Sequence, residues 1–262
     1  MKIIFMKFFF LLIIIFLPLN LSMASESITD IQFMTENYPP LNYSDEGEIK
    51  GIFVDILMEI TKKMDVSFTR DKILLLPWAR AYNSILKNKK KCLFGMARSA
   101  DRENLFKWAG PVMDLKIILI SKNSQAVQVN ILDDIRNLKT GVVKDDIAEK
   151  TLLASGIGAK SLIYAFGDQA AKDHLLHLDR GMIDLWAHDE IGARWMIKRQ
   201  SLDPRNFKTV YTLQDTKAYF AFSRDISDSF ILAFQGELDT MKKKTVYQKI
   251  FHTYLSEELS SF

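Results

Sequence analysis

The residue types that most often carry catalysis or bind metals are sparse in this sequence. Cys92 is the only cysteine, so no internal disulfide can form, and its apolar neighbours Leu93 and Phe94 predict a buried, inert thiol. The four histidines include the pair His174 and His177, but a zinc site needs about three or four ligands and no companion cluster is present. The sequence also contains no Ser/His/Asp arrangement and no glycine-rich phosphate loop. We therefore expect a protein without a metal or cofactor.

The composition is that of a globular chain without a pronounced charge. The 262 residues are 48% hydrophobic and 26% charged, which is enough apolar material for a packed core. The formal net charge is +3. It falls by two, to about +1, when the leader residues Lys2 and Lys7 are discounted. Neither value indicates a nucleic-acid partner.

The N-terminal segment has the pattern of a secretory signal peptide. Two lysines precede the apolar run Phe8–Leu17, and small residues lead to a cleavage position after Ala24. The alternative is a retained membrane anchor, but a spanning helix needs about 20 apolar residues, and this run is shorter and ends at Pro18. We expect residues 1–24 to be removed and the mature protein to reside in the periplasm.

Short apolar runs alternate with amphipathic stretches along the mature chain. The first helix is predicted by apolar residues from Phe53 to Met64 at the spacing of one buried face, and the second opens at Pro77. Two further helices follow Asp228 and Thr245. The alternation predicts an α/β fold with largely parallel strands. The predicted strands are Ile31–Thr35, Cys92–Met96, Ile117–Ser121, Lys139–Val143, Ser161–Phe166, Ile183–Ala187 and Ala218–Phe222.

No Pro/Gly/Ser linker, repeat or low-complexity tract interrupts this alternation. Two lobes would therefore be joined by strand crossings, which we place at Ile120–Asn123 on the way out and near Lys217 on the return. Lobe 1 would comprise residues 25–120 plus 218–262, and lobe 2 residues 121–217. Ligands of α/β sheets bind at the carboxyl ends of strands, so we expect a site in the cleft between the lobes.

Four stretches contain turn-forming glycines or prolines, and three of them add aromatic or charged residues. They are Tyr38–Tyr43 followed by Gly51–Ile56, then Gly95–Glu103, Gly141–Val143 and Gly181–Glu190. In this order and spacing they resemble the bacterial extracellular solute-binding proteins of the amino-acid-binding type, family 3. The resemblance implies a two-lobed type II fold that closes about a hinge on a small polar solute, in particular an amino acid. It also implies delivery of that solute to an inner-membrane ABC permease. We expect a monomer and no enzymatic activity.

By this resemblance Arg102 binds the carboxylate of the solute, because a guanidinium donates two parallel charge-assisted hydrogen bonds. Arg98 could share the task. The alternative for Arg102 is a weak surface ion pair with Asp101 or Glu103.

Asp189 corresponds to the acid that meets the ammonium group, and its alternative role is the N-cap of the following helix. Tyr38 and Trp78 would form apolar walls, although Trp78 also fits the buried face of its own helix. The segment that carries the arginine adds Gly95 and Ala97 to the predicted ligand-binding residues.

The helix start near Asp145 and Asp146 departs from the family pattern. Family members often present small or hydroxyl residues there, whose backbone N–H groups help to hold a carboxylate. Two aspartates would repel an anionic group. Either the carboxylate relies on Arg102 alone, or the solute is cationic or not an α-amino acid, and we include Asp145 among the predicted ligand-binding residues.

Two rival functions share the predicted architecture. Some relatives are dehydratases or lyases, which would need a cleft carboxylate as acid or base, and Glu103 and Glu190 are available. The other rival is a ligand-sensing partner of a membrane receptor.

Overall fold

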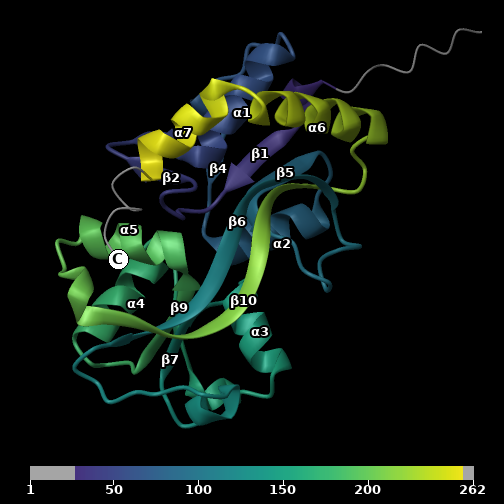
Figure 1. Cartoon of the computed structure of the whole chain (residues 1–262). Coiled ribbons are helices and arrows are strands. Elements are labelled where there is room, and N and C mark those ends of the chain that lie inside the picture. Colours follow the sequence, from purple (N-terminus) through teal and green to yellow (C-terminus); the bar gives the residue numbers. More distant parts are fainter. Residues whose placement is uncertain (1–26, 256–262) are drawn as a thin grey trace, which may run out of the picture.

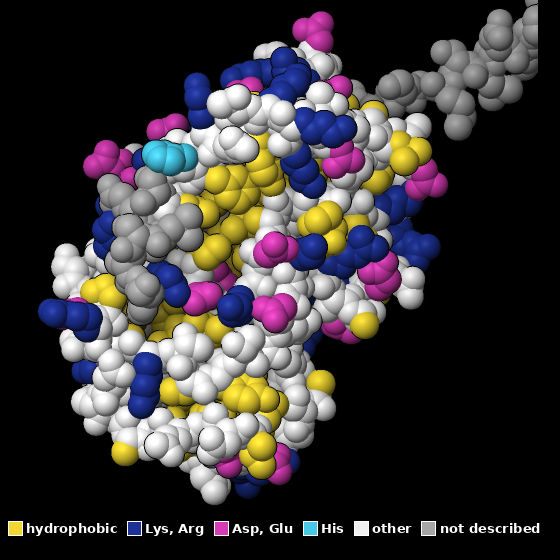
Figure 2. All heavy atoms as spheres, in the orientation of Figure 1, with side chains coloured by type: hydrophobic (Ala, Val, Ile, Leu, Met, Phe, Trp, Pro, Cys, Tyr) yellow, Lys and Arg dark blue, Asp and Glu magenta, His cyan; other side chains and the backbone are white. Residues whose placement is uncertain are grey.

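The computed structural model describes residues 27–255, which form two lobes joined by two long strands (Figure 1). The predicted signal peptide, residues 1–24, lies outside the described residues. Within residues 27–255, none of the helices has the length and apolar character needed to cross a bilayer. Lys, Arg, Asp and Glu side chains are interspersed over the face seen in Figure 2, so this face has no large patch of one sign.

Lobe 1 is a parallel sheet of three strands between helices. Helices α1, α6 and α7 pack together on one face of the sheet, and α2 covers the other face (Figure 1). A short hairpin, β2–β3, follows the first strand. The elements are β1 (Gln32–Thr35), β2 (Tyr43–Asp45), β3 (Glu48–Lys50), α1 (Ile52–Lys63), β4 (Leu74–Leu75), α2 (Trp78–Lys87), β5 (Lys91–Ala97), α6 (Asp228–Lys242) and α7 (Thr245–Leu255).

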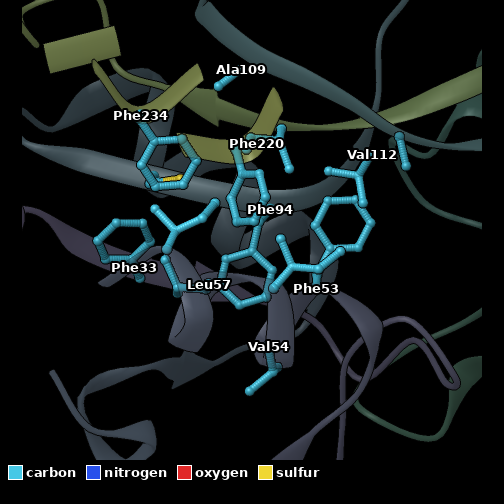
Figure 3. Close-up of a cluster of buried hydrophobic side chains, with 14 of the residues drawn as sticks. Phe33, Phe53, Val54, Leu57, Phe94, Ala109, Val112, Phe220 and Phe234 are labelled. Atoms are coloured by element: carbon cyan, nitrogen blue, oxygen red, sulfur yellow. The ribbon is translucent and has the colours of Figure 1, made fainter. Parts of the chain in front are cut away.

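Helices cover both faces of the lobe 1 sheet, so the central strands are apolar on both sides. In β1, Phe33 faces the cluster under α1 and α6, whereas Met34 faces the cluster under α2. Figure 3 shows the first cluster, in which the ring centroids of Phe53 and Phe220 lie 5.1 Å apart. Each fully buried aromatic side chain of this kind contributes about 1.5–3 kcal/mol. The fully buried Cys92 belongs to the same cluster, as predicted, and burial raises the pKa of its thiol well above the ordinary value.

Lobe 2 repeats the same architecture. Its three parallel strands carry α3 on one face, with α4 and α5 on the other. Trp186 is fully buried. The elements are β7 (Thr140–Val143), α3 (Ile147–Ala154), β8 (Leu162–Ala165), α4 (Ala170–Asp179), β9 (Leu185–Asp189) and α5 (Glu190–Arg199).

Strands β6 (Lys107–Lys122) and β10 (Phe207–Phe222) connect the lobes (Figure 1). They pair with each other in antiparallel fashion along their length, which yields one continuous sheet of order β4-β1-β5-β10-β6-β9-β7-β8. In lobe 1, β10 is antiparallel to β5, and in lobe 2, β6 is antiparallel to β9. The two-lobed α/β fold predicted from the sequence is therefore confirmed.

The two connecting strands are longer than predicted. Each has 16 residues, whereas the apolar pattern marked only Ile117–Ser121 and Ala218–Phe222. The middle of β10 is polar and partly exposed, so it lacks the apolar run of a buried strand. These two strands are also antiparallel to their neighbours, unlike the largely parallel arrangement expected from the alternation of elements.

The pairing also indicates where the chain passes from one lobe to the other. Leu115 packs in the core of lobe 1, whereas Ile117 packs in lobe 2 and pairs with Asp189 of β9. We therefore place the first crossing at Lys116, earlier than the Ile120–Asn123 boundary suggested by the sequence. Lys116 pairs with Asp215, so we place the return crossing at Asp215.

Candidate functional site

A cavity of about 320 Å³ lies between the lobes, at the small end of the range of ligand sites. Side chains from both lobes line it. The residues that carry its chemistry are Glu36, Trp78 and Arg102 from lobe 1, and Asp146, Phe166 and His188 from lobe 2.

The cavity wall forms where parallel strands of both lobes reach their carboxyl ends. In lobe 1, Glu36 follows β1 and Ala97 ends β5. In lobe 2, Val143 ends β7, Ala165 ends β8, and His188 is the second-last residue of β9. This is the position at which α/β sheets bind ligands, because loops and helix starts converge there.

Glu36 is held in place by contacts around the carboxyl ends of β1 and β5. The side-chain amide of Asn42 donates to the backbone carbonyl of Glu36 at 2.7 Å, and the hydroxyl of Thr35 donates to the carbonyl of Phe94 at 3.1 Å. Gly95 follows with φ +77°, and a Cβ atom there would lie 2.5 Å from Oδ1 of Asn42. A glycine is required at this position for both reasons.

Arg102 is almost completely buried between two aromatic rings. Its guanidinium carbon lies 5.2 Å from the ring centroids of Trp78 and of Tyr82. One terminal nitrogen donates to the carbonyl of Ala97 at 3.2 Å, and the other donates across the cleft to the carbonyl of Asp145 at 2.9 Å. Arg102 therefore joins the two lobes while it faces the cavity.

Four buried polar atoms of cavity-lining residues have no hydrogen-bond partner among the described residues. They are Nε of Arg102, Nε1 of Trp78, Oδ1 of Asn37 and Nε2 of His188. Leaving a buried polar group unpaired costs about 1–3 kcal/mol, so such atoms are rare unless a ligand or water satisfies them. Two of the four, on Arg102 and Trp78, are obligate donors and suit a carboxylate.

Two acids face the same cavity. Burial, reinforced by the neighbouring Asp146, raises the pKa of Glu36 to about 8, although Arg102 acts in the opposite direction. Burial likewise raises the pKa of Asp146 to about 7, against the hydrogen bond from the backbone of Glu149 and the charge of Arg102. Asp146 is the N-cap of α3, and its carboxylate accepts from the backbone N–H of Glu149 at 2.8 Å. The site holds more carboxyl groups than the single buried guanidinium can neutralise.

His188 adds an uncharged aromatic surface. Its ring stacks on Trp186 with a centroid separation of 4.6 Å and meets the edge of Tyr38 at 5.1 Å. Burial holds the pKa of His188 below its ordinary value despite the nearby carboxylate of Asp189. The ring is therefore neutral at physiological pH and contributes no cation to the cavity.

Further contacts across the cleft hold the lobes together. The side-chain amide of Asn37 donates to the carbonyl of Asp168 at 3.0 Å. Arg199 of α5 pairs with Asp45 of β2 at 2.9 Å. Together with the bond from Arg102 to Asp145, these contacts describe a closed arrangement of the lobes.

The model of the bacterial extracellular solute-binding proteins, family 3, matches residues 31–257 of the sequence. This chain belongs to that family. The match covers nearly the whole described chain and agrees with the resemblance of the four sequence stretches. No curated protein matched the sequence.

Solved structures of other family-like proteins share the fold at low sequence identity. A histidine kinase sensor domain with similarity to periplasmic binding proteins has a TM-score of 0.74 and 18% identity over 86% of this chain and 96% of its own. The substrate-binding protein of an amino acid ABC transporter has a TM-score of 0.71 and 17% identity, over 86% and 99%. The arginine-, lysine-, histidine-binding protein ArtJ from Geobacillus stearothermophilus has 0.73 and 13%, over 86% and 95%.

Five of the residues that the family resemblance selected line the cavity together. They are Tyr38, Trp78, Gly95, Ala97 and Arg102. Trp78 belongs to the core under α2 and also lines the cavity.

Three other selected residues lie outside the cavity lining. Arg98 forms a bidentate pair with Glu103, and its guanidinium lies 5.3 Å from the ring centroid of Tyr219. Asp189 caps α5 and accepts from the backbone N–H of Gly192 at 2.8 Å. Asp145 contributes the carbonyl that accepts from Arg102, not its carboxylate.

Glu36, Asp146 and His188 line the cavity but were not among the ligand-binding residues predicted from the sequence. Glu36 lies two residues before Tyr38, at the end of a predicted strand, which is where ligand groups gather in α/β sheets. Asp146 was recognised as a possible helix start. Which of Asp145 and Asp146 faces the cavity depends on the backbone: Asp145 adopts φ +63°, and Asp146 takes the capping position.

Proposed function

We propose that this protein is a periplasmic solute-binding protein that captures an amino acid or a related solute by hinge closure. The observation that carries this proposal is the bipolar cavity between the lobes. Unpartnered buried donors of Arg102 and Trp78 face the same space as the carboxyl groups of Glu36 and Asp146. A solute with a carboxylate and an ammonium group satisfies both sets.

In this proposal the carboxylate binds to Nε of Arg102 and Nε1 of Trp78, which stacks on Tyr82. The ammonium group binds to Glu36 and Asp146, whereas Asp189 acts indirectly, through Tyr38 and His188. Burial and the carboxylate of Asp189 raise the pKa of Tyr38 well above its ordinary value, so Tyr38 is a neutral wall. The exposed ring of Phe166 adds an apolar surface at the cavity mouth.

We further propose that the closed, loaded form delivers its solute to an inner-membrane ABC permease. Membership of an extracellular solute-binding family supports this, as does the likeness to the substrate-binding protein of an amino acid ABC transporter. The likeness to a sensor domain supports the alternative, a partner of a membrane receptor. Uptake of radiolabelled solute should fall when the gene is deleted. Unchanged uptake with loss of a transcriptional response would favour the receptor.

The carboxylate assignment is tested with the variant Arg102→Lys. Lysine keeps the charge but has no N–H at the position of Nε, so affinity for the captured amino acid should fall by about 30-fold or more, corresponding to a loss of at least about 2 kcal/mol. Isothermal titration calorimetry measures this, with melting of the ligand-free variants alongside. Arg98→Lys is the matched control, because Arg98 pairs with Glu103 outside the cavity and should change the affinity little. Equal affinities of the wild type and Arg102→Lys would contradict the assignment.

A further inference from the structure

The charged groups of the cavity fall into an inner and an outer set. The inner set comprises the partly buried carboxyl groups of Glu36 and Asp146 and the buried guanidinium of Arg102. The outer set comprises Arg80, Lys144 and Asp168, which are exposed and screened by solvent. The inner set therefore governs the charge that a captured solute meets.

Neither Lys144 nor His188 supplies a positive charge that neutralises the inner carboxyl groups. Lys144 is exposed and pairs with the buried Glu149 at 3.1 Å. His188 is neutral, for the reason given above. Ionisation of both inner carboxyl groups would leave one negative charge in excess of Arg102, inside a closed cavity where uncompensated charge is costly.

Arg102 neutralises the acids only in part. Its terminal nitrogens already donate to the carbonyls of Ala97 and Asp145, and its ring neighbours are Trp78 and Tyr82. Arg102 is only 1% exposed, and its Nε has no hydrogen-bond partner among the described residues. This unpartnered donor independently indicates that the same cavity binds a ligand. The acids and an orphaned donor thus face one cavity from different elements.

We propose that the solute carries a second cationic group, an amine or a guanidinium, in addition to its α-ammonium, and that Glu36 and Asp146 together bind its two cationic groups. The solute would then bring a net charge of +1, which offsets the inner excess of one carboxylate. This inference rests on the proposed function and adds to it the charge class of the solute.

The test compares compounds that differ in charge at nearly constant size. Binding of L-arginine and L-lysine to the mature protein is measured by calorimetry beside that of L-citrulline and L-glutamine, which are neutral, and of putrescine, which lacks a carboxylate. Removing one partner of a buried charge pair costs about 2–5 kcal/mol. L-Arginine should therefore bind at least about 30-fold more tightly than its neutral counterpart L-citrulline.

The variants Glu36→Gln and Asp146→Asn locate the cationic subsite. Asparagine caps helices about as well as aspartate, so Asp146→Asn should fold normally. Each variant should reduce the preference for L-arginine over L-citrulline by about tenfold or more. The matched control is Asp203→Asn, because Asp203 also caps a helical turn but lies outside the cavity lining. It should leave the preference unchanged.

Binding should also release protons. Glu36 faces Arg102 and the N-caps of α3 and α5, Asp146 and Asp189, with the neutral His188 beside them. Burial raises the pKa of Glu36 to about 8. A bound cation favours the carboxylate form, so affinity for L-arginine should rise from pH 6 to pH 8.5. The binding enthalpy at pH 7 should depend on the ionisation heat of the buffer, and Glu36→Gln should weaken that dependence.

The possible results separate the two proposals. Tighter binding of L-citrulline or L-glutamine than of the cationic amino acids would overturn the charge assignment and leave amino-acid capture intact. Binding of putrescine without any amino acid would support the charge assignment and overturn amino-acid capture. Failure of every compound to bind would overturn both.

Discussion

At the scale of single residues, Glu36 is placed in the cleft at a cost to the ligand-free protein. Burial and Asp146 raise its pKa from 4.5 to about 8, so the folded state holds a proton that the unfolded chain releases. The stability that this proton provides is fully present below pH 4.5 and is lost as the pH rises through about 8. Function and stability are therefore opposed at this position.

Glu36→Gln should relieve this cost, because glutamine is neutral at every pH. We expect the melting temperature of the ligand-free variant to exceed that of the wild type at pH 8.5, with a difference that narrows towards pH 4.5. Circular dichroism melts at a series of pH values measure this difference. Glu59→Gln, a partly buried acid that pairs with Lys62 in α1, is the control. A difference between wild type and Glu36→Gln that does not vary with pH would contradict the assignment.

At the scale of elements, β5 requires glycine at the point where it approaches the cavity. Gly95 and Gly47 both adopt positive φ, +77° and +85°. A Cβ atom at Gly95 would meet Asn42 at 2.5 Å, whereas nothing lies within 4 Å of one at Gly47. Substituting Gly47 and Gly95 in turn therefore separates the free-energy cost of the backbone conformation from that of the steric clash.

Gly47→Ala should lower the free energy of unfolding by about 1–2 kcal/mol, the cost of a left-handed alanine. Gly95→Ala should lower it by more, because Asn42 must also move away from the carbonyl of Glu36. Urea denaturation of both variants measures the difference. We also expect weaker ligand binding in Gly95→Ala alone. Equal destabilisation would show that the packing around Asn42 is loose.

Two helices of this fold begin with an aspartate N-cap, but the two carboxylates differ in their position relative to the cavity. Asp146 and Asp189 are both N-caps that accept a backbone N–H from three residues ahead, at 2.8 Å in each case. Only Asp146 lines the cavity. The cap motif therefore identifies the start of a helix but does not indicate whether the capping carboxylate faces the cavity.

At the scale of the whole molecule, the described closed form rests on few polar contacts. The pair between Arg199 and Asp45 is largely exposed, and such pairs contribute about 0–1 kcal/mol. The bond from Arg102 to Asp145 is more sheltered but single, and the bond from Asn37 to Asp168 is exposed. A bound solute that contacts both lobes should therefore dominate the equilibrium between open and closed forms.

We expect saturation with the captured amino acid to lower the radius of gyration of the mature protein. Small-angle X-ray scattering with and without the ligand measures this change. The ligand-bound curve should match the closed arrangement described above, and the ligand-free curve should be more extended. The same radius of gyration in both states would mean that capture does not involve closure about the β6 and β10 crossings.

The sequence alone determined the class of the protein and most of its elements. Strands such as β5 are buried on both faces, so they appear as continuous apolar runs, and α1 has the periodicity of one buried face. The resemblance to family motifs predicted Tyr38, Trp78 and Arg102 as residues of the cleft. Residues 107–116 of β6 and 207–217 of β10 were missed. The missed part of β10 is largely polar and is held in the sheet by pairing with β6.

The tertiary structure decided which charges face the ligand. Asp145 and Asp146 are adjacent, but a left-handed backbone at Asp145 directs its carbonyl to Arg102 and leaves Asp146 at the cavity wall. Glu36 acquires its raised pKa from burial in the cleft, reinforced by Asp146 of lobe 2. Composition and motifs specify which side chains are present, whereas the direction and desolvation of each carboxylate depend on contacts between segments far apart in the chain.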